Sequence, residues 1–408
     1  MIVLVLLIVV VLLVSWVLLW VRFGPVLRAV FREPVLATPV FILECDDWGA
    51  GDHGQADSLR DIREILESCK LSGGGHPVMT LGVNLAAPRV VDTEQGYGFD
   101  TVTLSAAESR ETLLAMLEGH HCGLMPLQLH GFTHFSPSQF QSYLDTLKQG
   151  GEAGPFALGA PLLTEQLPSS VQSRWLPAQT DSESQAQWEA QEHQRLLGIP
   201  PCVAVPPTFV WRADIESGWA AAGVKTVVTP GSRAVNRTSK GFEYDKTNIA
   251  NGDLSESGLL CLVRSVYFEP CKGVGSAECR QGIERSVACG RPAIIETHRW
   301  NYIHPDPSTR AQSFAELRAL IAWVNQQHPE WRSLSTAAIA QEYRRTASGG
   351  ESKSGVRFER DMGARALAWR RRLTCSPIPG VLCWASGLMA ALWFGQRLWW
   401  TRKRAFSA

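Results

Sequence analysis

Two aspartates and two histidines lie in short polar segments whose spacing suits metal binding. Asp46 and Asp47 are adjacent at the end of one apolar run, and His130 and His134 flank Gly-Phe-Thr near the end of another. Neighbouring carboxylates repel each other unless a cation or a shared proton relieves the repulsion. One carboxylate and two imidazoles would hold a divalent metal by three ligands and leave positions open for water. Taken singly, the aspartates could instead form a turn, and the histidines could be one buried and one surface residue.

Other polar residues also follow apolar runs. Ser136–Gln139 predicts a helix start directly after the histidines, with serine at the cap, proline at the first position and glutamine at the third. Pro206 and Pro207 end a later run, and His298 ends the last one. In β/α barrels the carboxyl ends of the strands meet on one face and build the active site. These residues are therefore expected to converge.

The elements that must position them alternate between strand and helix patterns. Short, nearly continuous apolar runs suit parallel strands buried on both faces. They are 40–47, 78–84, 124–131, 202–208, 225–231, 259–266 and 293–298. Amphipathic stretches between or after them predict helices at 57–70, 105–118, 136–148, 186–197, 215–222, 277–288, 310–327 and 335–345. Segments 85–104 and 150–184 are expected to be long loops. The alternation predicts an α/β fold, either a distorted (β/α) barrel of about seven parallel strands or a doubly wound sheet.

The order of these motifs resembles that of the polysaccharide deacetylase family, the NodB-homology group. The matching segments are Cys45–Gly49, His130–His134, Val205–Phe209 and Ile295–His298, and the resemblance covers about residues 38–345. It favours the barrel over the doubly wound sheet. It also implies a divalent metal, most often zinc, and the removal of acetyl or other acyl groups from an N-acylated glycan or lipid-linked sugar.

The resemblance implies a role for each matching residue. Asp47, His130 and His134 would hold the metal. Asp46 would be the general base that takes a proton from water, and His298 would be the general acid that protonates the leaving amine.

The chain departs from the family at one important position. The family has an arginine before the proline of the third motif, where it orients the base, and this chain has Ala204 and Val205 there. Arg264 or Arg212 could replace it. Six residues are predicted to lie on the substrate side of the site: Trp48, which replaces a usual glycine, Pro207, Trp211, Arg264, Ile295 and Arg299.

Two other functions remain open at this stage. A glycoside hydrolase on a related barrel would need two carboxylates about 5–10 Å apart, and Glu44, Asp46, Asp47 and Glu296 are candidates. A catalytically degenerate barrel could instead bind glycan or act as a scaffold in the cell envelope.

Composition and the two chain ends predict a membrane location. Lys+Arg and Asp+Glu both total 39, so no net charge attracts nucleic acid. Residues 1–21 are apolar for about the 20 residues that cross a bilayer, and 376–396 form a second apolar segment. Between them we expect a barrel at 36–346 and a basic linker at 347–372. The expected location is a bacterial cytoplasmic membrane, with one or two spans in contact with lipid. The flanking arginines leave the orientation open.

Overall fold

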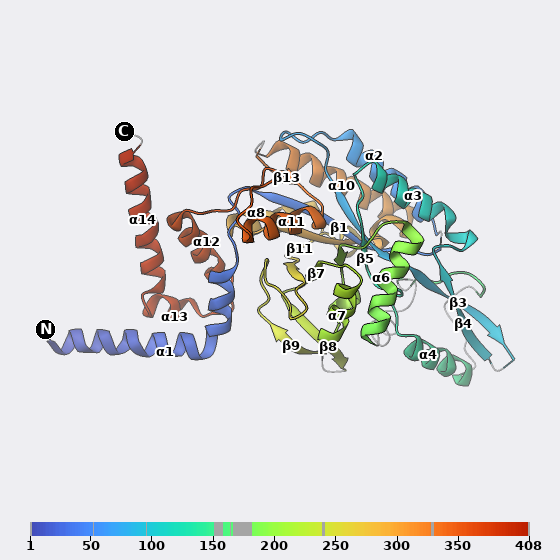
Figure 1. The fold of residues 1–408 in the computed structure, drawn as a ribbon, viewed down its shortest axis with the longest axis horizontal. Coiled ribbons are helices and arrows are strands. Elements are labelled where there is room, and N and C mark those ends of the chain that lie inside the picture. Colours follow the sequence, from blue (N-terminus) through green and yellow to red (C-terminus); the bar gives the residue numbers. More distant parts are fainter. Residues whose placement is uncertain are drawn as a thin grey trace.

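The computed structural model describes residues 2–51, 53–94, 96–150, 158–163, 165, 182–238, 241–327 and 330–406. A curved parallel sheet surrounded by helices forms the main body, and a long N-terminal helix extends from one side of it (Figure 1). The first and last helices lie close together at that side, although they are the two ends of the chain.

Seven predicted strand runs form the parallel sheet. The strand order is β10-β7-β6-β5-β2-β1-β12-β11, and β13 also pairs with β1. Because β10 and β11 are successive segments at opposite ends of this order, residues 260–267 connect the two edges and close the sheet. The prediction of a distorted barrel of about seven parallel strands is confirmed. The strands are β1 Val40–Gly49, β2 Met79–Asn84, β5 Leu127–Leu129, β6 Val203–Ala204, β7 Thr226–Thr229, β10 Leu260–Val263, β11 Val266–Tyr267, β12 Ala293–His298 and β13 Arg332–Ser333.

Helices connect these strands at the predicted places. The helices are α2 Gln55–Ser68, α3 Arg110–His121, α4 Pro137–Gly150, α6 Glu183–Leu197, α7 Ala213–Ala221, α8 Ser276–Ala288, α9 Trp300–Ile303, α10 Pro307–Gln326 and α11 Thr336–Ala347. Most of their amphipathic faces pack on the outside of the sheet, where parallel strands need covering, whereas α11 packs in a smaller cluster with Val40 and Ile42 and α4 packs on the hairpin 86–103. Short 3-10 helices occur at Ala107–Ser109, Pro207–Phe209 and Pro270–Lys272.

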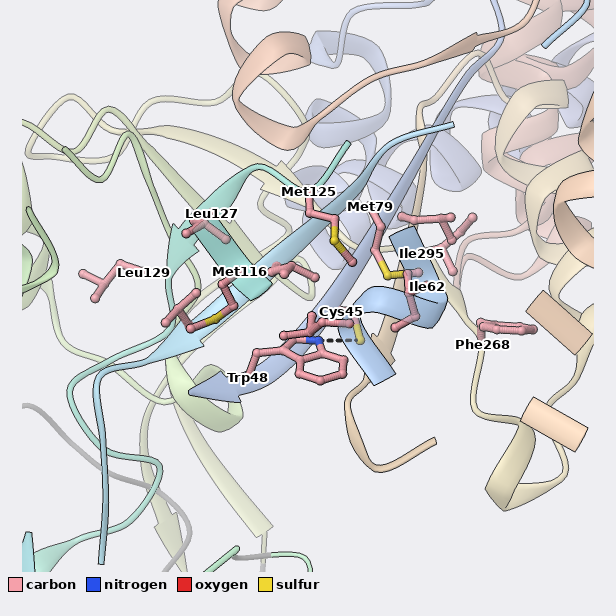
Figure 2. Packing of buried hydrophobic residues seen from close by; sticks show 14 of the residues in the cluster. Cys45, Trp48, Ile62, Met79, Met116, Met125, Leu127, Leu129, Phe268 and Ile295 are labelled. Atoms are coloured by element: carbon pink, nitrogen blue, oxygen red, sulfur yellow. Dashed lines mark hydrogen bonds between the residues drawn. The ribbon is translucent and has the colours of Figure 1, made fainter. Parts of the chain in front are cut away.

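The side chains of β1 alternate between two environments. Phe41, Leu43 and Cys45 pack in the large cluster between the sheet and the outer helices. Figure 2 shows Cys45 in this cluster, among methionine and leucine side chains from neighbouring elements. Val40 and Ile42 instead join a smaller cluster that includes residues of β10 and α11. The alternation leaves the later inward-facing positions of β1 to polar residues.

Two hairpins are absent from the sequence prediction. Segment 85–104, expected to be a loop, contains β3 Ala86–Thr93 and β4 Gly96–Thr103, which pair antiparallel. A second hairpin joins β8 Ser232–Thr238 and β9 Gly241–Thr247. Glycine, proline or charged residues interrupt these four strands and hide the strand pattern, and β9 is also largely solvent-exposed. Most of the predicted loop 150–184 lies outside the described residues.

The N-terminal apolar segment is a single helix, α1 Ile2–Arg32. It is the one helix in the described part of the chain that is long and apolar enough to cross a membrane, although a signal sequence or a core helix would meet the same criterion. Only 11% of its most apolar 18-residue window is buried. The rest of the chain therefore leaves this apolar surface uncovered.

The C-terminal region differs from its prediction. Segment 376–396 is divided between α13 Gly380–Ala385 and α14 Leu388–Phe406 and is no single apolar helix. Both helices contribute to a cluster with Leu19, Leu27 and Val30 of α1. The expected linker 347–372 also contains most of α12 Met362–Thr374. This part of the linker prediction is wrong because α12 packs against the other terminal helices.

Candidate metal centre

A backbone irregularity at the end of β1 turns both aspartates toward the same region. The register of β1 against β2 shifts between Cys45 and Trp48. Asp47 has φ 74°, in the left-handed region that non-glycine residues rarely occupy. Because of this bulge, Cys45 and Trp48 both face the outer helices, while Asp46 and Asp47 both face polar partners. Simple strand alternation would have separated the two carboxylates.

His130 is fixed by contacts to two neighbouring strands. It follows β5, and its backbone N–H donates to Val83 O at 2.9 Å. Its Nδ1 lies 2.9 Å from Val205 O. A carbonyl oxygen can only accept a hydrogen bond, so Nδ1 carries the hydrogen and the neutral ring has its lone pair at Nε2. This backbone contact is the type that orients metal-binding histidines.

The histidine nitrogens and the Asp47 carboxylate face one another. Asp47 Oδ1 lies 3.2 Å from His130 Nε2 and 3.4 Å from His134 Nε2. Ligand atoms from all three residues lie within 4.8 Å of one another. Two tetrahedral ligands, each about 2.1 Å from one zinc-sized ion, would be about 3.4 Å apart. The spacing therefore fits a cation held between them.

If the His130 ring is neutral, its buried contact with the Asp47 carboxylate needs a cation between the two groups. Asp47 Oδ1 and His130 Nε2 are buried and have no hydrogen bond of good geometry within the described residues. A carboxylate oxygen opposite an imidazole lone pair is repulsive unless a proton or a metal ion lies between them. Burial works against ionisation of Asp47, but the nearby His134, His130 and His298 outweigh it and hold the pKa of its carboxyl well below the ordinary value. For His130, burial is outweighed by Asp46 and Asp47, which raise its pKa.

Asp46 is held by Arg264, one of the two arginines that the sequence analysis named as candidates to orient it. Arg264 lies at the point where the sheet closes and donates from Nη1 to Asp46 Oδ2 at 2.5 Å and from Nε to Glu44 Oε2 at 2.6 Å. Its guanidinium also lies 5.4 Å from the centre of the Phe209 ring. Burial raises the pKa of Asp46, but Arg264 and His130 outweigh it and lower that pKa. The predicted alternative, Arg212, pairs with Asp214 at the surface.

A close approach by β2 confines the Asp46 carboxylate. A Cβ atom at Gly82 would lie 2.2 Å from Asp46 Oδ1, so only glycine leaves space for that oxygen. Glu44, two residues earlier on β1, is fully buried and accepts hydrogen bonds from Gln128 and Thr336 as well as from Arg264. Asp46 is therefore fixed from one side by Arg264 and from the other by the backbone of β2.

His298, at the end of β12, is paired with a carboxylate that the sequence reading did not select. Its Nδ1 contacts Glu269 Oε1, and Glu269 Oε2 accepts a hydrogen bond from Asn301 at 2.9 Å. Burial lowers the pKa of His298, but the Glu269 hydrogen bond and the charges of Glu269, Asp47 and Glu296 raise it to about 10. His298 is therefore a proton donor at neutral pH, and its side chain is 26% exposed.

Three residues predicted on the substrate side lie in the core. Trp48 and Ile295 are fully buried and Trp211 is 3% exposed, all in the cluster under the outer helices. Figure 2 shows the Trp48 indole, which donates to Cys45 Sγ at 3.1 Å. Trp211 Nε1 donates to Glu216 at 2.8 Å. The prediction of substrate contact is wrong for these three, because their strand or turn positions face the helices.

The other predicted substrate residues support neighbouring loops. Pro207 packs against Gly131, where an added Cβ would lie 2.8 Å from Pro207 Cγ and where φ is 81°. Arg299 is buried, donates to Glu165 at 2.9 and 3.0 Å, and donates its backbone N–H to Asp46 O at 3.0 Å. These contacts within the protein account for the buried positions of Pro207 and Arg299, as they do for Arg264, and none of them requires a substrate.

The sequence analysis missed Glu269 and Gly82 and considered Glu296 only as a carboxylate of a glycoside hydrolase, although strand position points to all three. Glu269, Glu296 and Gly82 all lie on or directly after strands that carry a predicted site residue or neighbour one. Inward-facing positions alternate along β12, so Glu296 shares the side of His298. Glu269 follows β11, which ends one residue later than the predicted run 259–266.

Comparisons with known proteins find only distant structural likeness. No family model matches the chain, and no curated protein matches it. A protein described as a polysaccharide deacetylase from Mycobacterium smegmatis is 12% identical with a TM-score of 0.39, over 78% of this chain and 95% of that chain. A 4-alpha-glucanotransferase from Thermococcus litoralis is 10% identical with a TM-score of 0.39, over 75% and 40%. A family 4 carbohydrate esterase from Streptomyces lividans in complex with acetate is 13% identical with a TM-score of 0.33, over 71% and 91%. Likeness at this level does not identify an activity.

Proposed function

We propose that this chain is a metal-dependent hydrolase that removes acetyl or another acyl group from an N-acylated glycan or lipid-linked sugar. The observation that carries the proposal is the convergence of Asp47, His130 and His134, with Asp46 and His298 at the same end of the barrel. The three ligand residues are a carboxylate and two imidazoles, which suits zinc among the common divalent metals. Resemblance of the motif order to polysaccharide deacetylases adds to this proposal.

The charge of the site also supports a bound cation. Five buried carboxylates belong to this region, against the three cations Arg264, His298 and Arg299, the last of which is paired with Glu165. They are Glu44, Asp46, Asp47, Glu269 and Glu296. Such an excess of buried negative charge is costly unless a cation offsets part of it.

The residues around the metal divide the proton transfers between them. A bound divalent metal would polarise the acyl carbonyl and lower the pKa of water. Asp46, oriented by Arg264 and confined by Gly82, takes the proton of the attacking water. His298, held by Glu269, donates its Nε2 proton to the leaving group. Base and acid thus approach the acyl carbon from two different strands, β1 and β12.

A buried joint connects the apolar helix to the barrel. Arg372 of α12 is 2% exposed and donates to backbone carbonyls of Glu33 at 2.8 Å and Gly290 at 3.1 Å. Glu33 also pairs with Arg291 at 2.6 Å. These contacts lie at the amino ends of the strands, and the rise along β1 from Val40 to Asp47 is about 23 Å. If α1 is a membrane anchor, the joint holds the mouth of the barrel facing away from the bilayer.

An acetate-release assay with metal analysis tests the proposed function. The full-length chain in detergent is expected to contain one divalent ion, to release acetate from N-acetylated oligosaccharides, and to lose activity with a chelator. His134→Ala should lose both the ion and the activity, whereas His121→Ala, at the exposed end of α3, should keep both.

Other outcomes would favour the alternatives. Release of reducing ends without any effect of a chelator would support a glycoside hydrolase. Glycan binding with neither metal nor turnover would support a scaffold. Either result would contradict the proposed hydrolase.

A further inference from the structure

Glu296 is a carboxylate at the site that neither holds the metal nor takes part in the proposed proton transfers. It lies on β12, is 7% exposed, and its side chain accepts no hydrogen bond from the described residues. Its Oε1 lies 3.7 Å from His298 Nε2, and its Oε2 lies 3.8 Å from Arg264 Nη1. By contrast, Glu44, its neighbour on β1, has three hydrogen-bond donors. Glu296 therefore has unused acceptor capacity in a place where few donors are available.

The position of Glu296 relative to His298 indicates which part of a bound substrate Glu296 would contact. His298 has two ring nitrogens, and Nδ1 is occupied by Glu269. Nε2 is the remaining proton donor, so the leaving group must approach Nε2. Glu296 is the carboxylate on that side. It would therefore lie beside the leaving atom of a bound substrate, a few ångströms from the proton being transferred.

A carboxylate in this place distinguishes two kinds of leaving group. An amide nitrogen must be protonated before its bond to carbon breaks, so it carries positive charge in the transition state. An ester oxygen leaves with partial negative charge. A fixed negative group stabilises the first and destabilises the second, because preorganised charges act on the charge that develops. In a partly buried site such a charge changes a rate by about ten- to a hundredfold.

We propose that Glu296 makes the site selective for amine leaving groups, so that its substrates are N-acylated amino sugars and not O-acylated sugars. This inference rests on the proposed hydrolase function and assigns to Glu296 the preference of that site for N-acyl over O-acyl groups. In the reaction, water adds to the acyl carbon and loses a proton to Asp46. The nitrogen takes the Nε2 proton of His298, the C–N bond breaks, and a carboxylic acid and a free amine result. Glu296 forms an ion pair with that nitrogen as it becomes positive.

The test compares two substrates in one enzyme. Oligosaccharides that differ only in an N-acetyl or an O-acetyl group at the same carbon are given to the full-length, metal-loaded chain, and acetate is measured. Glu296→Gln should lower kcat/KM for the N-acetyl substrate at least tenfold and leave the O-acetyl value unchanged or higher. Because the result is a ratio within one protein sample, partial unfolding of the variant does not affect it.

Two controls separate this effect from general damage. Glu269→Gln removes the carboxylate that holds His298, so it should lower activity on both substrates by a similar factor. Glu284→Gln removes an exposed glutamate of α8 and should leave both values unchanged. Equal loss on both substrates in Glu296→Gln would overturn the selectivity proposal while leaving the hydrolase proposal intact. Absence of acetate release from either substrate by the parent chain would overturn both.

Binding of the product provides a second readout that does not depend on turnover. A glucosamine oligomer should bind the parent chain at least tenfold more tightly than the matching glucose oligomer, measured by calorimetry with and without a chelator. Glu296→Gln should remove this difference, because the ammonium group loses its counter-charge. The same preference in parent and variant would contradict the proposal.

Discussion

Replacement of Arg264 by methionine would remove the charge that holds the proposed base while keeping much of the side-chain volume. The side chain of Arg264 is 3% exposed and contacts Asp46 at 2.5 Å and Glu44 at 2.6 Å. Asp46 would be left without a hydrogen-bond donor to its carboxylate within the described residues, whereas Glu44 would keep Gln128 and Thr336. Most of the cost should therefore come from Asp46.

The size of the effect follows from burial. Removing one partner of a buried ion pair lowers the free energy of unfolding by about 3–5 kcal/mol, because the remaining charge has neither water nor a partner around it. For a barrel of this size, that corresponds to a fall in Tm of about 5–8 °C. Loss of an oriented general base should lower kcat/KM by about a hundredfold or more.

Thermal unfolding of the full-length chain in detergent, followed by tryptophan fluorescence, measures the first effect, and acetate release measures the second. Arg212→Met is a matched control, since its pair with Asp214 is exposed at the surface and should contribute at most about 1 kcal/mol. The double variant Arg264→Met with Asp46→Asn should recover part of the lost stability, because the unpaired charge is gone. A change in Tm below about 2 °C, with activity retained, would refute the reasoning.

Three further predictions concern the same site. Asp47→Gly should abolish metal binding, measured by elemental analysis, yet raise the stability of the metal-free chain by about 1 kcal/mol, because glycine adopts φ 74° without strain; lower stability would contradict the role of the bulge. Gly82→Ala should lower acetate release at least tenfold, because its Cβ would lie 2.2 Å from Asp46 Oδ1, and unchanged kinetics would show that the carboxylate has room to move. Burial lowers the pKa of His298, but Glu269 outweighs it and the pKa lies at about 10, so activity should be lost as the pH rises through the basic limb of the profile. In Glu269→Gln this limb should move to lower pH, since the neutral amide no longer favours the charged ring, and an unmoved limb would exclude His298 as the acid.

The barrel and the cluster of Asp47, His130 and His134 could be predicted from the sequence because both depend on local patterns. Apolar runs such as 40–47 and 293–298 are buried on both faces, so their strand character is visible in composition alone. Polar residues at the ends of such runs must meet at one edge of a parallel sheet, which brought Asp47 and His130 together in the prediction. In the hairpin Ala86–Thr93 with Gly96–Thr103, glycine, proline and charged residues interrupt that pattern, and the hairpin was missed.

Which way each side chain points, and what holds it, was decided by the tertiary structure. Asp47 and Trp48 each face the side of β1 opposite to the one that simple alternation would give, because one bulge changes the alternation of a strand by one residue. Arg264 reaches Asp46 across 218 positions of the sequence, and no local pattern encodes such a contact. The sequence alone determined which chemical groups are available and at which edge of the sheet they lie. Only the closure of the barrel determined which carboxylate is paired with an arginine, which with a histidine, and which, Glu296, is left with an open acceptor.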